Sequence, residues 1–342
     1  MRPVFVAAHN PQQHGGGTVM AGVARCFYSV WLVACGLAWV GGAWADVWVS
    51  NARDNSVVQL DAEGNFVRRL AVCQRPRHMV WLNPGKALLV ACSDSHQLAL
   101  IDVDRWALTD VLPTQPGPDG FAVSPDGTTA YVSVQDDSAL LAYDLASKTQ
   151  RFATTVGAEP EGVLVGADGA RVYVVSEVAN TLYCLDARSG VVLWQAAVGA
   201  RPRRLAMSPP GTELWVSNEL GASLSVVDSA SGASIATLNF VVPGVTLAEV
   251  KPVGMAMSSD GRTLWVALGR ANRVAEVDVA SRSVRGYVVV GKRPWGIAVS
   301  QDGRRLYVAN GLSDDLTVVD TGTRAVLNTA PVGLQPHTVL VD

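Results

Sequence analysis

The sequence predicts an all-β fold, a seven-bladed β-propeller whose blades are four-stranded antiparallel sheets. One proline recurs at steps of 42 residues, with a single step of 50, at Pro76, Pro118, Pro160, Pro202, Pro252, Pro294 and Pro336. A glycine lies nine residues after each of the first six prolines, and an aspartate lies 26 residues after each of them. Repeats of about 40 to 50 residues that contain several short strands indicate a propeller.

Turn residues divide each repeat into four strands. In the copy that begins at Pro294, apolar and β-branched runs predict strands over 297–300, 306–309, 316–319 and 325–329. A tight turn is expected at 301–303, because Gly303 can adopt positive φ at no steric cost. Such apolar strands suit sheets that are buried on both faces between neighbouring blades.

The two ends of the repeat array complement each other. The first repeat begins at Trp48 and lacks an innermost strand, whereas residues 336–342 form an innermost strand without a blade of their own. We therefore predict that the C-terminal strand completes the N-terminal blade and closes the ring. A closed ring leaves no open sheet edge.

The first 45 residues read as a leader. After Met20, the expected start, Arg25 precedes an apolar run, and a small-residue cleavage pattern ends at Ala45. This order predicts a secretory signal peptide that is cleaved after Ala45. The remaining residues, 46–342, are then a single periplasmic or secreted propeller domain with no membrane span after processing.

Composition excludes one class of partner. The 342 residues carry 27 Lys and Arg against 30 Asp and Glu, a net charge of −3, and 49% of them are hydrophobic. This balance gives no reason to expect binding to nucleic acid. We expect a monomer that binds a protein partner or a small molecule.

Five cysteines occur, two of them in the leader. Leu32 to Cys35 resembles a lipoprotein processing box, so anchoring through Cys35 is an alternative to secretion. Cys73 and Cys92 fall on the same expected face of the ring, and whether they form a disulfide stays open. Cys184 lies within an expected strand and is more simply a core residue.

The variable residues of the repeat mark a candidate binding site. They occupy the first and second places after each proline, on the face where loops surround the channel mouth. The candidate site residues are Arg77, His78, Asp119, Glu161, Arg203, Arg204, Trp295 and His337. The alternative is that these charges are solvated loop ends that neutralise one another.

Three histidines of the propeller fall on this same face. Imidazole and carboxylate groups such as His78, His96, His337 and Asp94 can ligate Zn, Cu or Fe. No HxH, HxxxH or CxxC pair fixes two ligands locally. We therefore predict surface histidines and no metal, with a metal or redox site as the alternative.

Three short segments carry a family resemblance. Residues 48–51, 215–218 and 307–310 read WVSN, WVSN and YVAN. They resemble the YVTN family of β-propeller repeats, over residues 46–342. The resemblance implies the fold and leaves the activity open.

Further segments are similar to the β-propeller proteins associated with PQQ-dependent alcohol catabolism. They are RPR at 75–77 and 201–203, EPEG at 159–162, ALGRANRV at 267–274, and the lengthened connection at 240–250. This resemblance implies a periplasmic binding or scaffold protein that serves a quinoprotein alcohol oxidation or transport system. Its partner would be a quinoprotein dehydrogenase, a cytochrome or a transporter component.

We predict no cofactor, and we find no catalytic motif in the sequence. Residues 185–194 resemble one tryptophan-docking repeat of PQQ enzymes, but a single copy favours a structural Trp194 and no cofactor. No nucleophile elbow, Walker loop or haem-attachment motif occurs, so we favour a binding role over catalysis. The alternative is a lactonase-like hydrolase that uses Arg77, His78, Glu161 and Arg203, because seven-bladed propellers also host lactonases.

Overall fold

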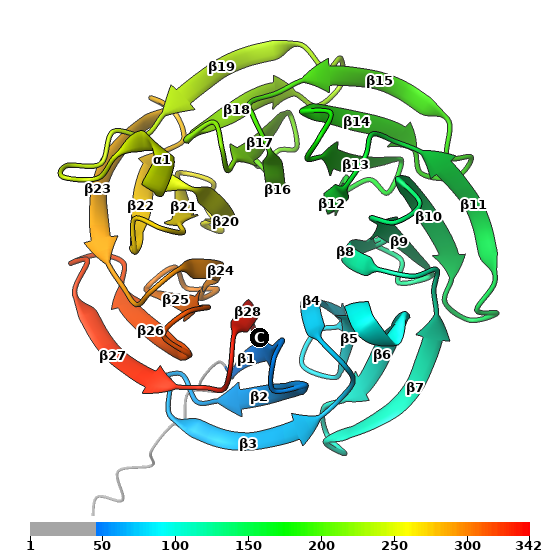
Figure 1. Ribbon diagram of the computed structural model, residues 1–342, viewed down its shortest axis with the longest axis horizontal. Helices are drawn as coiled ribbons and strands as arrows, with labels where there is room; N and C mark the ends of the chain where they lie inside the picture. Colours follow the sequence, from blue (N-terminus) through cyan, green and yellow to red (C-terminus); the bar gives the residue numbers. More distant parts are fainter. Residues whose placement is uncertain (1–45) are drawn as a thin grey trace, which may run out of the picture. The chain divides into compact units, whose positions relative to one another are not determined.

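Seven four-stranded antiparallel sheets stand in a ring, with the first strand of each blade innermost (Figure 1). The computed structural model describes residues 46–342, so the expected leader and its cleavage site lie outside the described residues. The predicted seven-bladed propeller is confirmed. Within 46–342, no helix has the length and apolar character needed to cross a membrane.

The strands follow the repeat, with the innermost strand of each blade starting at the recurring proline. The first three blades contain β28 (Pro336–Val341), β1 (Val47–Asn51), β2 (Ser56–Leu60) and β3 (Phe66–Ala71); β4 (Pro76–Asn83), β5 (Ala87–Cys92), β6 (Gln97–Asp102) and β7 (Ala107–Pro113); and β8 (Pro118–Val123), β9 (Thr129–Val134), β10 (Ala139–Asp144) and β11 (Gln150–Thr155). A 3-10 turn, η1 (Ser93–Ser95), follows β5.

The remaining four blades repeat the same order. They contain β12 (Pro160–Val165), β13 (Arg171–Ser176), β14 (Thr181–Asp186) and β15 (Val192–Ala197); β16 (Pro202–Met207), β17 (Glu213–Asn218), β18 (Ser223–Asp228) and β19 (Ser234–Asn239); β20 (Pro252–Met257), β21 (Thr263–Leu268), β22 (Arg273–Asp278) and β23 (Ser283–Val289); and β24 (Pro294–Val299), β25 (Arg305–Asn310), β26 (Asp315–Asp320) and β27 (Val326–Pro331).

The innermost strands start earlier than predicted. β24 begins at Pro294 rather than at Ile297, because Pro294 pairs with Asn310 before a register shift that ends at Ile297. The same register shift follows the proline in the other six innermost strands, for example in β12 and β16. The irregular stretch between the two pairs carries the candidate site residues.

The ring closes as predicted. β28 pairs antiparallel with β1, with Val341 opposite Val47. At the end of this pair, the Asp46 backbone N–H donates to Asp342 Oδ1 at 2.6 Å. Residues almost 300 positions apart therefore form one continuous blade.

The recurring aspartate and aromatic residues stabilise the blades. Asp144 Oδ1 accepts hydrogen bonds from the backbone N–H groups of Ala146 (3.1 Å) and Ser147 (2.8 Å), which fixes the turn between the two outer strands. The Tyr131 hydroxyl donates to the carbonyl of Ala187 in the next blade at 2.8 Å. The first contact shapes a blade, and the second ties it to its neighbour.

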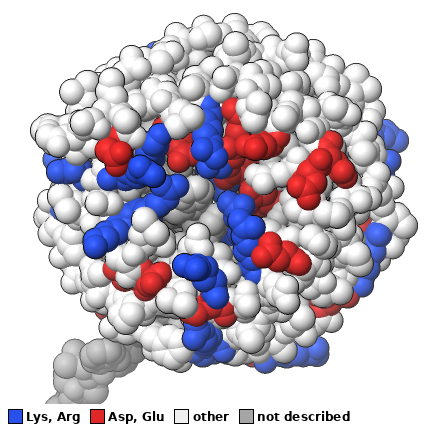
Figure 2. All heavy atoms as spheres, viewed as in Figure 1, with Lys and Arg blue, Asp and Glu red and all other residues white. Residues whose placement is uncertain are grey.

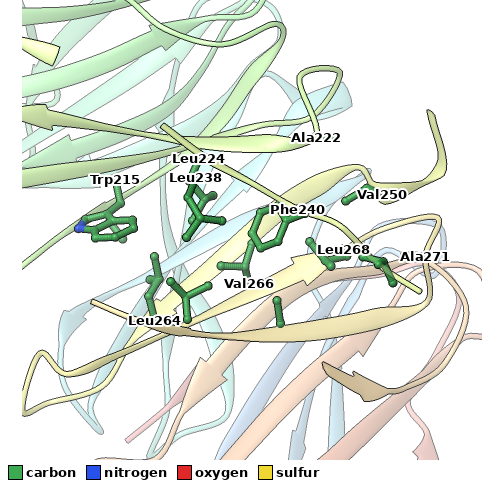
Figure 3. Close-up of a cluster of buried hydrophobic side chains, with 14 of the residues drawn as sticks. Trp215, Ala222, Leu224, Leu238, Phe240, Val250, Leu264, Val266, Leu268 and Ala271 are labelled. Carbon is green, nitrogen blue, oxygen red and sulfur yellow. The ribbon is translucent and has the colours of Figure 1, made fainter. Parts of the chain in front are cut away.

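Buried side chains between adjacent blades form the core. Figure 3 shows the cluster between the β16–β19 and β20–β23 blades, which includes Trp215, Leu224 and Val266. The longest repeat step falls here, in the connection that holds α1 (Leu247–Val250). Phe240 and Val250 from this connection are fully buried in the cluster, so the eight added residues extend the core.

Candidate functional site at the channel mouth

We call the face that carries the connections into the innermost strands the mouth face. On the face seen in Figure 2, charged side chains of both signs gather around a central hollow. In six blades the residue before the recurring proline has left-handed φ although it is not glycine: Arg75, Glu159, Arg201, Lys251, Arg293 and Gln335. Only a few per cent of such residues adopt this conformation. It turns the chain inward at the rim of the channel.

Hydrogen bonds hold this strained turn in place. The Arg201 carbonyl accepts from the backbone N–H of Glu219 at 2.8 Å, and the Arg201 N–H donates to Asn180 Oδ1 at 2.8 Å. Arg293 makes the same pair of contacts with Gly311 (2.9 Å) and Asn272 (3.0 Å). The rim arginines therefore stand on a fixed backbone.

Just below the rim, glycines allow the innermost strands of neighbouring blades to approach each other closely. Four blades have glycine at the second place after the proline: Gly120, Gly162, Gly254 and Gly296. A Cβ atom on Gly254 would lie 2.0 Å from the Trp295 carbonyl oxygen of the next blade. At the same level the other three blades carry side chains, those of His78, Arg204 and Thr338, so functional groups enter the channel where the wall is otherwise bare backbone.

These side chains line a channel cavity of about 240 Å³. His78, Arg204, Trp295, His337 and Thr338 supply its polar lining. The structure thus brings together four of the eight candidate site residues, from four different blades. Thr338 was not among the candidates, and its small hydroxyl gives no signal that sequence reasoning could have used.

Both cavity histidines are held neutral. Burial, followed by the nearby Arg204 charge, lowers the pKa of His78 to about 3. Burial and Arg77 lower the pKa of His337 well below its usual value. Arg77 Nε donates to His337 Nε2 at 3.4 Å, and His337 Nδ1 lies 3.1 Å from Thr338 Oγ1, so the proton of the neutral ring is on Nδ1.

Arg204 lines the cavity, and its terminal guanidinium nitrogens are buried. Its Nη1 lies 2.9 Å from Glu161 Oε1, yet neither terminal nitrogen makes a hydrogen bond to another described residue. The Nε1–H of Trp295 also lacks a partner within 46–342. Buried donors of this kind are normally satisfied in folded proteins. These donors therefore have hydrogen-bonding capacity left for a ligand.

Arg203 has a different role from its neighbour. Its guanidinium bonds Glu161 and Glu177 and lies 2.6 Å from Glu219 Oε2. Burial and the adjacent Glu161 raise the pKa of Glu177 to about 8. Arg203 and Arg204 hold the pKa of Glu161 well below its usual value despite burial. This buried ion cluster fixes Glu161, which in turn orients Arg204.

The charged candidates are therefore not solvated loop ends. The exposed fraction is 0% for Glu161, 1% for Asp119 and 7% for Arg203. Arg77 pairs with Asp119 at 2.6 Å. Since a buried charge is stable only when it is paired, the opposite charges in neighbouring blades match each other across the blade boundaries.

His96 lies apart from the other two histidines. It is exposed after η1, and its Nδ1 accepts from the Gly117 backbone N–H at 3.3 Å. Asp94 instead pairs with Arg75 at 3.3 Å. Among residues 46–342, no three His, Cys, Asp or Glu side chains are arranged to hold a metal ion.

Cys73 and Cys92 form a disulfide, with their Cα atoms 5.9 Å apart. It joins the connection before β4 to the end of β5, beside Arg75. Cys184 is a buried free thiol. Trp194 packs against Tyr173, with ring centroids 5.9 Å apart, which is the structural role expected for it.

The rim contributes residues that sequence reasoning missed. A mouth pocket of about 160 Å³ lies beside the channel cavity and shares Trp295 and His337 with it. Arg75, Arg77 and Arg293 also line it. The Arg293 guanidinium carbon lies 5.1 Å from the centre of the Trp295 ring. Arg75 and Arg293 directly precede the recurring prolines, and the sequence pattern did not distinguish that position from an ordinary turn.

Comparison with known proteins places the chain in a family. A family model described as outer membrane protein assembly factor BamB matches residues 53–240, more than half of the chain. The chain belongs to this β-propeller family. A model described as lactonase, 7-bladed beta-propeller, matches residues 162–329. None of the curated proteins matches the chain.

Several solved structures share the fold. The periplasmic gluconolactonase PpgL of Pseudomonas aeruginosa is 19% identical, with a TM-score of 0.74 over 87% of this chain and 99% of that one. A putative 6-phosphogluconolactonase of Bacteroides fragilis is 13% identical, with a TM-score of 0.74 over 89% and 99% of the two chains. At these identities the likeness shows the propeller fold alone.

The predicted accessory role in PQQ-dependent alcohol oxidation is wrong. The lactonase family model and the similar structures named as lactonases favour the alternative of a lactonase-like enzyme. The resemblance to seven-bladed propeller repeats holds, but the subgroup chosen within it finds no support. The segments that resemble this subgroup belong to the propeller repeat, and proteins with many different functions are built from such repeats.

Proposed function

We propose that this propeller hydrolyses lactones in the channel cavity. One observation carries the proposal: Arg204, which is paired with Glu161, and the neutral imidazole of His78 line the same small cavity. A lactone is neutral and compact, and its carbonyl oxygen accepts hydrogen bonds. The lactonase family model over 162–329 supports this assignment.

In the proposed reaction, water adds to the lactone carbonyl carbon and the ring C–O bond breaks. Arg204 donates hydrogen bonds to the carbonyl oxygen as negative charge develops on it. His78, which is unprotonated at neutral pH, accepts a hydrogen bond from the attacking water and orients it. The water proton passes to the departing ring oxygen, and the product is the open hydroxy acid. Arg203 and Glu161 position Arg204.

The test is a lactone hydrolysis assay in which the protons released by the hydroxy acid product are measured. We expect turnover of δ-valerolactone or D-glucono-1,5-lactone above the uncatalysed rate. Loss of one donor to a developing oxyanion costs about 10²–10³ in rate, so Arg204→Met should lower kcat/KM by that factor. The control is Arg188→Met, an exposed arginine in the turn between β14 and β15. Wild-type protein without lactone turnover would refute the proposal.

The location of the protein remains a proposal. The signal peptide read from residues 1–45 supports export to the periplasm or medium. Mass spectrometry of protein from an exporting host should give an N-terminus at Asp46. A retained leader would contradict export by this route.

A further inference from the structure

The channel cavity changes character with depth. Its polar lining comes from the first and second places after the prolines. Deeper residues, at the third and fourth places, line it with apolar side chains only: Met79, Val163, Leu205, Met255, Ile297, Val339 and Leu340. Because the innermost strands run inward from the rim, the cavity has a polar layer above an apolar layer.

We propose that the cavity selects lactones that carry a short unbranched hydrocarbon chain. The ring contacts His78 and Arg204, and the chain extends into the apolar layer. This inference rests on the proposed lactone hydrolysis and names its substrate class. Met255 and Leu205 become residues that determine chain length.

The chemistry of the apolar layer favours a hydrocarbon over a sugar. A polyhydroxylated lactone that reaches this depth would place hydroxyl groups against the half-buried Val163, Leu205 and Met255, whose side chains offer no strong hydrogen bond. A buried hydroxyl without a partner is unfavourable. A methylene at the same place leaves water for an apolar surface, which is favourable.

The cavity volume limits the chain. Pockets for drug-sized ligands measure roughly 300–1,000 Å³, and this cavity measures about 240 Å³. A lactone ring with a few methylenes would fill it, whereas a long acyl chain would not fit.

A series of γ-lactones tests the proposal: γ-butyrolactone, γ-hexalactone, γ-octalactone and γ-decalactone, with D-glucono-1,5-lactone for comparison. Each buried methylene should raise kcat/KM about threefold to fourfold, until the chain fills the cavity and the rise ends. In Met255→Phe the rise should end at a shorter chain. The matched control, Leu327→Phe, changes an exposed residue of β27 and should keep the wild-type profile.

Binding of 3-alkylcyclopentanones is measured by calorimetry on wild-type protein. In these ketones a methylene replaces the ring oxygen and the chain keeps its place relative to the carbonyl group, but the ring cannot be hydrolysed. This measurement does not depend on whether Met255→Phe folds. If gluconolactone is hydrolysed but neither rates nor affinities depend on chain length, the substrate class is wrong and the proposed function stands. If no lactone is hydrolysed, the proposed function fails, and affinities that do not rise with chain length overturn the apolar selection as well.

Discussion

At the scale of single residues, the cavity histidines should make stability depend on pH. The unfolded chain binds protons on these imidazoles near pH 6.5, whereas folded His78 binds one only near pH 3. The unfolded state therefore takes up more protons as the pH falls from about 6.5 towards 3, and the free energy of unfolding decreases over that window.

We expect the melting temperature to fall less between pH 7 and pH 5 in His78→Gln than in the wild type. Comparing variants isolates His78 from the carboxyl groups that titrate over the same range. The control is His96→Gln, because His96 is exposed and outside the cavity; it should keep the wild-type dependence. Equal slopes for wild type and His78→Gln would show that the imidazole is not held neutral.

A second residue-scale prediction concerns Arg203. Its loss in Arg203→Met leaves the three buried carboxyl groups of Glu161, Glu177 and Glu219 without the cation that they share, so the free energy of unfolding should fall by about 3–5 kcal/mol. Urea denaturation measures this loss. Arg188→Met, at an exposed position, should change stability by less than about 0.5 kcal/mol. A similar small effect for Arg203→Met would mean that the cluster is hydrated.

The sequence predicted His78, Arg204, Trp295 and His337 as site residues but missed Thr338, Arg75 and Arg293, and it did not predict the role of each residue. Arg203 and Arg204 occupy the first and second places after Pro202, and both are basic. The repeat pattern therefore gave no reason to assign them different roles. Only three-dimensional structure shows that three carboxylates surround Arg203 while Arg204 faces the cavity. Glu161 belongs to β12, whereas Glu177 and Glu219 lie in the loops after β13 and β17 of two neighbouring blades. No local sequence pattern encodes this juxtaposition.

At the scale of elements, the disulfide joins two positions that are occupied in other blades by a glycine and an asparagine in contact. Gly199, three residues before its proline, packs against Asn218 at the end of β17, and Gly291 packs against Asn310 in the same way. Cys73 and Cys92 hold these two positions in their own blade. Covalent bonding here replaces the packing of a glycine against an amide.

This equivalence predicts the outcome of replacing both cysteines. Cys73→Ser with Cys92→Ser should cost about 3 kcal/mol of unfolding free energy, the usual value for a loop of this size. Cys73→Gly with Cys92→Asn should recover part of that loss, because it restores the pair found in the other blades. Chemical denaturation compares the two. If the Gly–Asn variant is no more stable than the serine variant, the positions are not equivalent.

In the one repeat for which strand bounds were predicted, the outer three strands, β25, β26 and β27, lie within about two residues of the prediction. The turns between them carry glycine and aspartate, whose backbone preferences are local. The innermost strand was placed too late, since the register shift after the proline depends on the neighbouring blade. Gly254 illustrates this, because the atom that excludes its Cβ belongs to Trp295 in the next sheet.

At the scale of the whole molecule, β28 closes the ring. Deleting 336–342 would open the edge of β1 and remove the core contacts of Val339. We expect a fall in melting temperature of more than about 10 °C, since each kcal/mol lost lowers it by roughly 2–4 °C in a domain of this size or slightly smaller. Circular dichroism follows the transition, and light scattering detects association through the exposed edge.

Deletion of Asp342 alone serves as the control. It removes the Oδ1 acceptor of Asp46 and leaves the β1–β28 pairing intact, so the change should be a few degrees at most. If the longer deletion melts at the same temperature as this control, the first blade is stable with three strands.

The closing strand β28 also completes the channel cavity. His337 and Thr338 of β28 form one side of the channel cavity, and β28 follows the other strands of the ring in the sequence. A truncated translation product has six intact blades but an incomplete binding cavity. Activity at this site would therefore report that synthesis of β28 has finished and that the first and last segments have met.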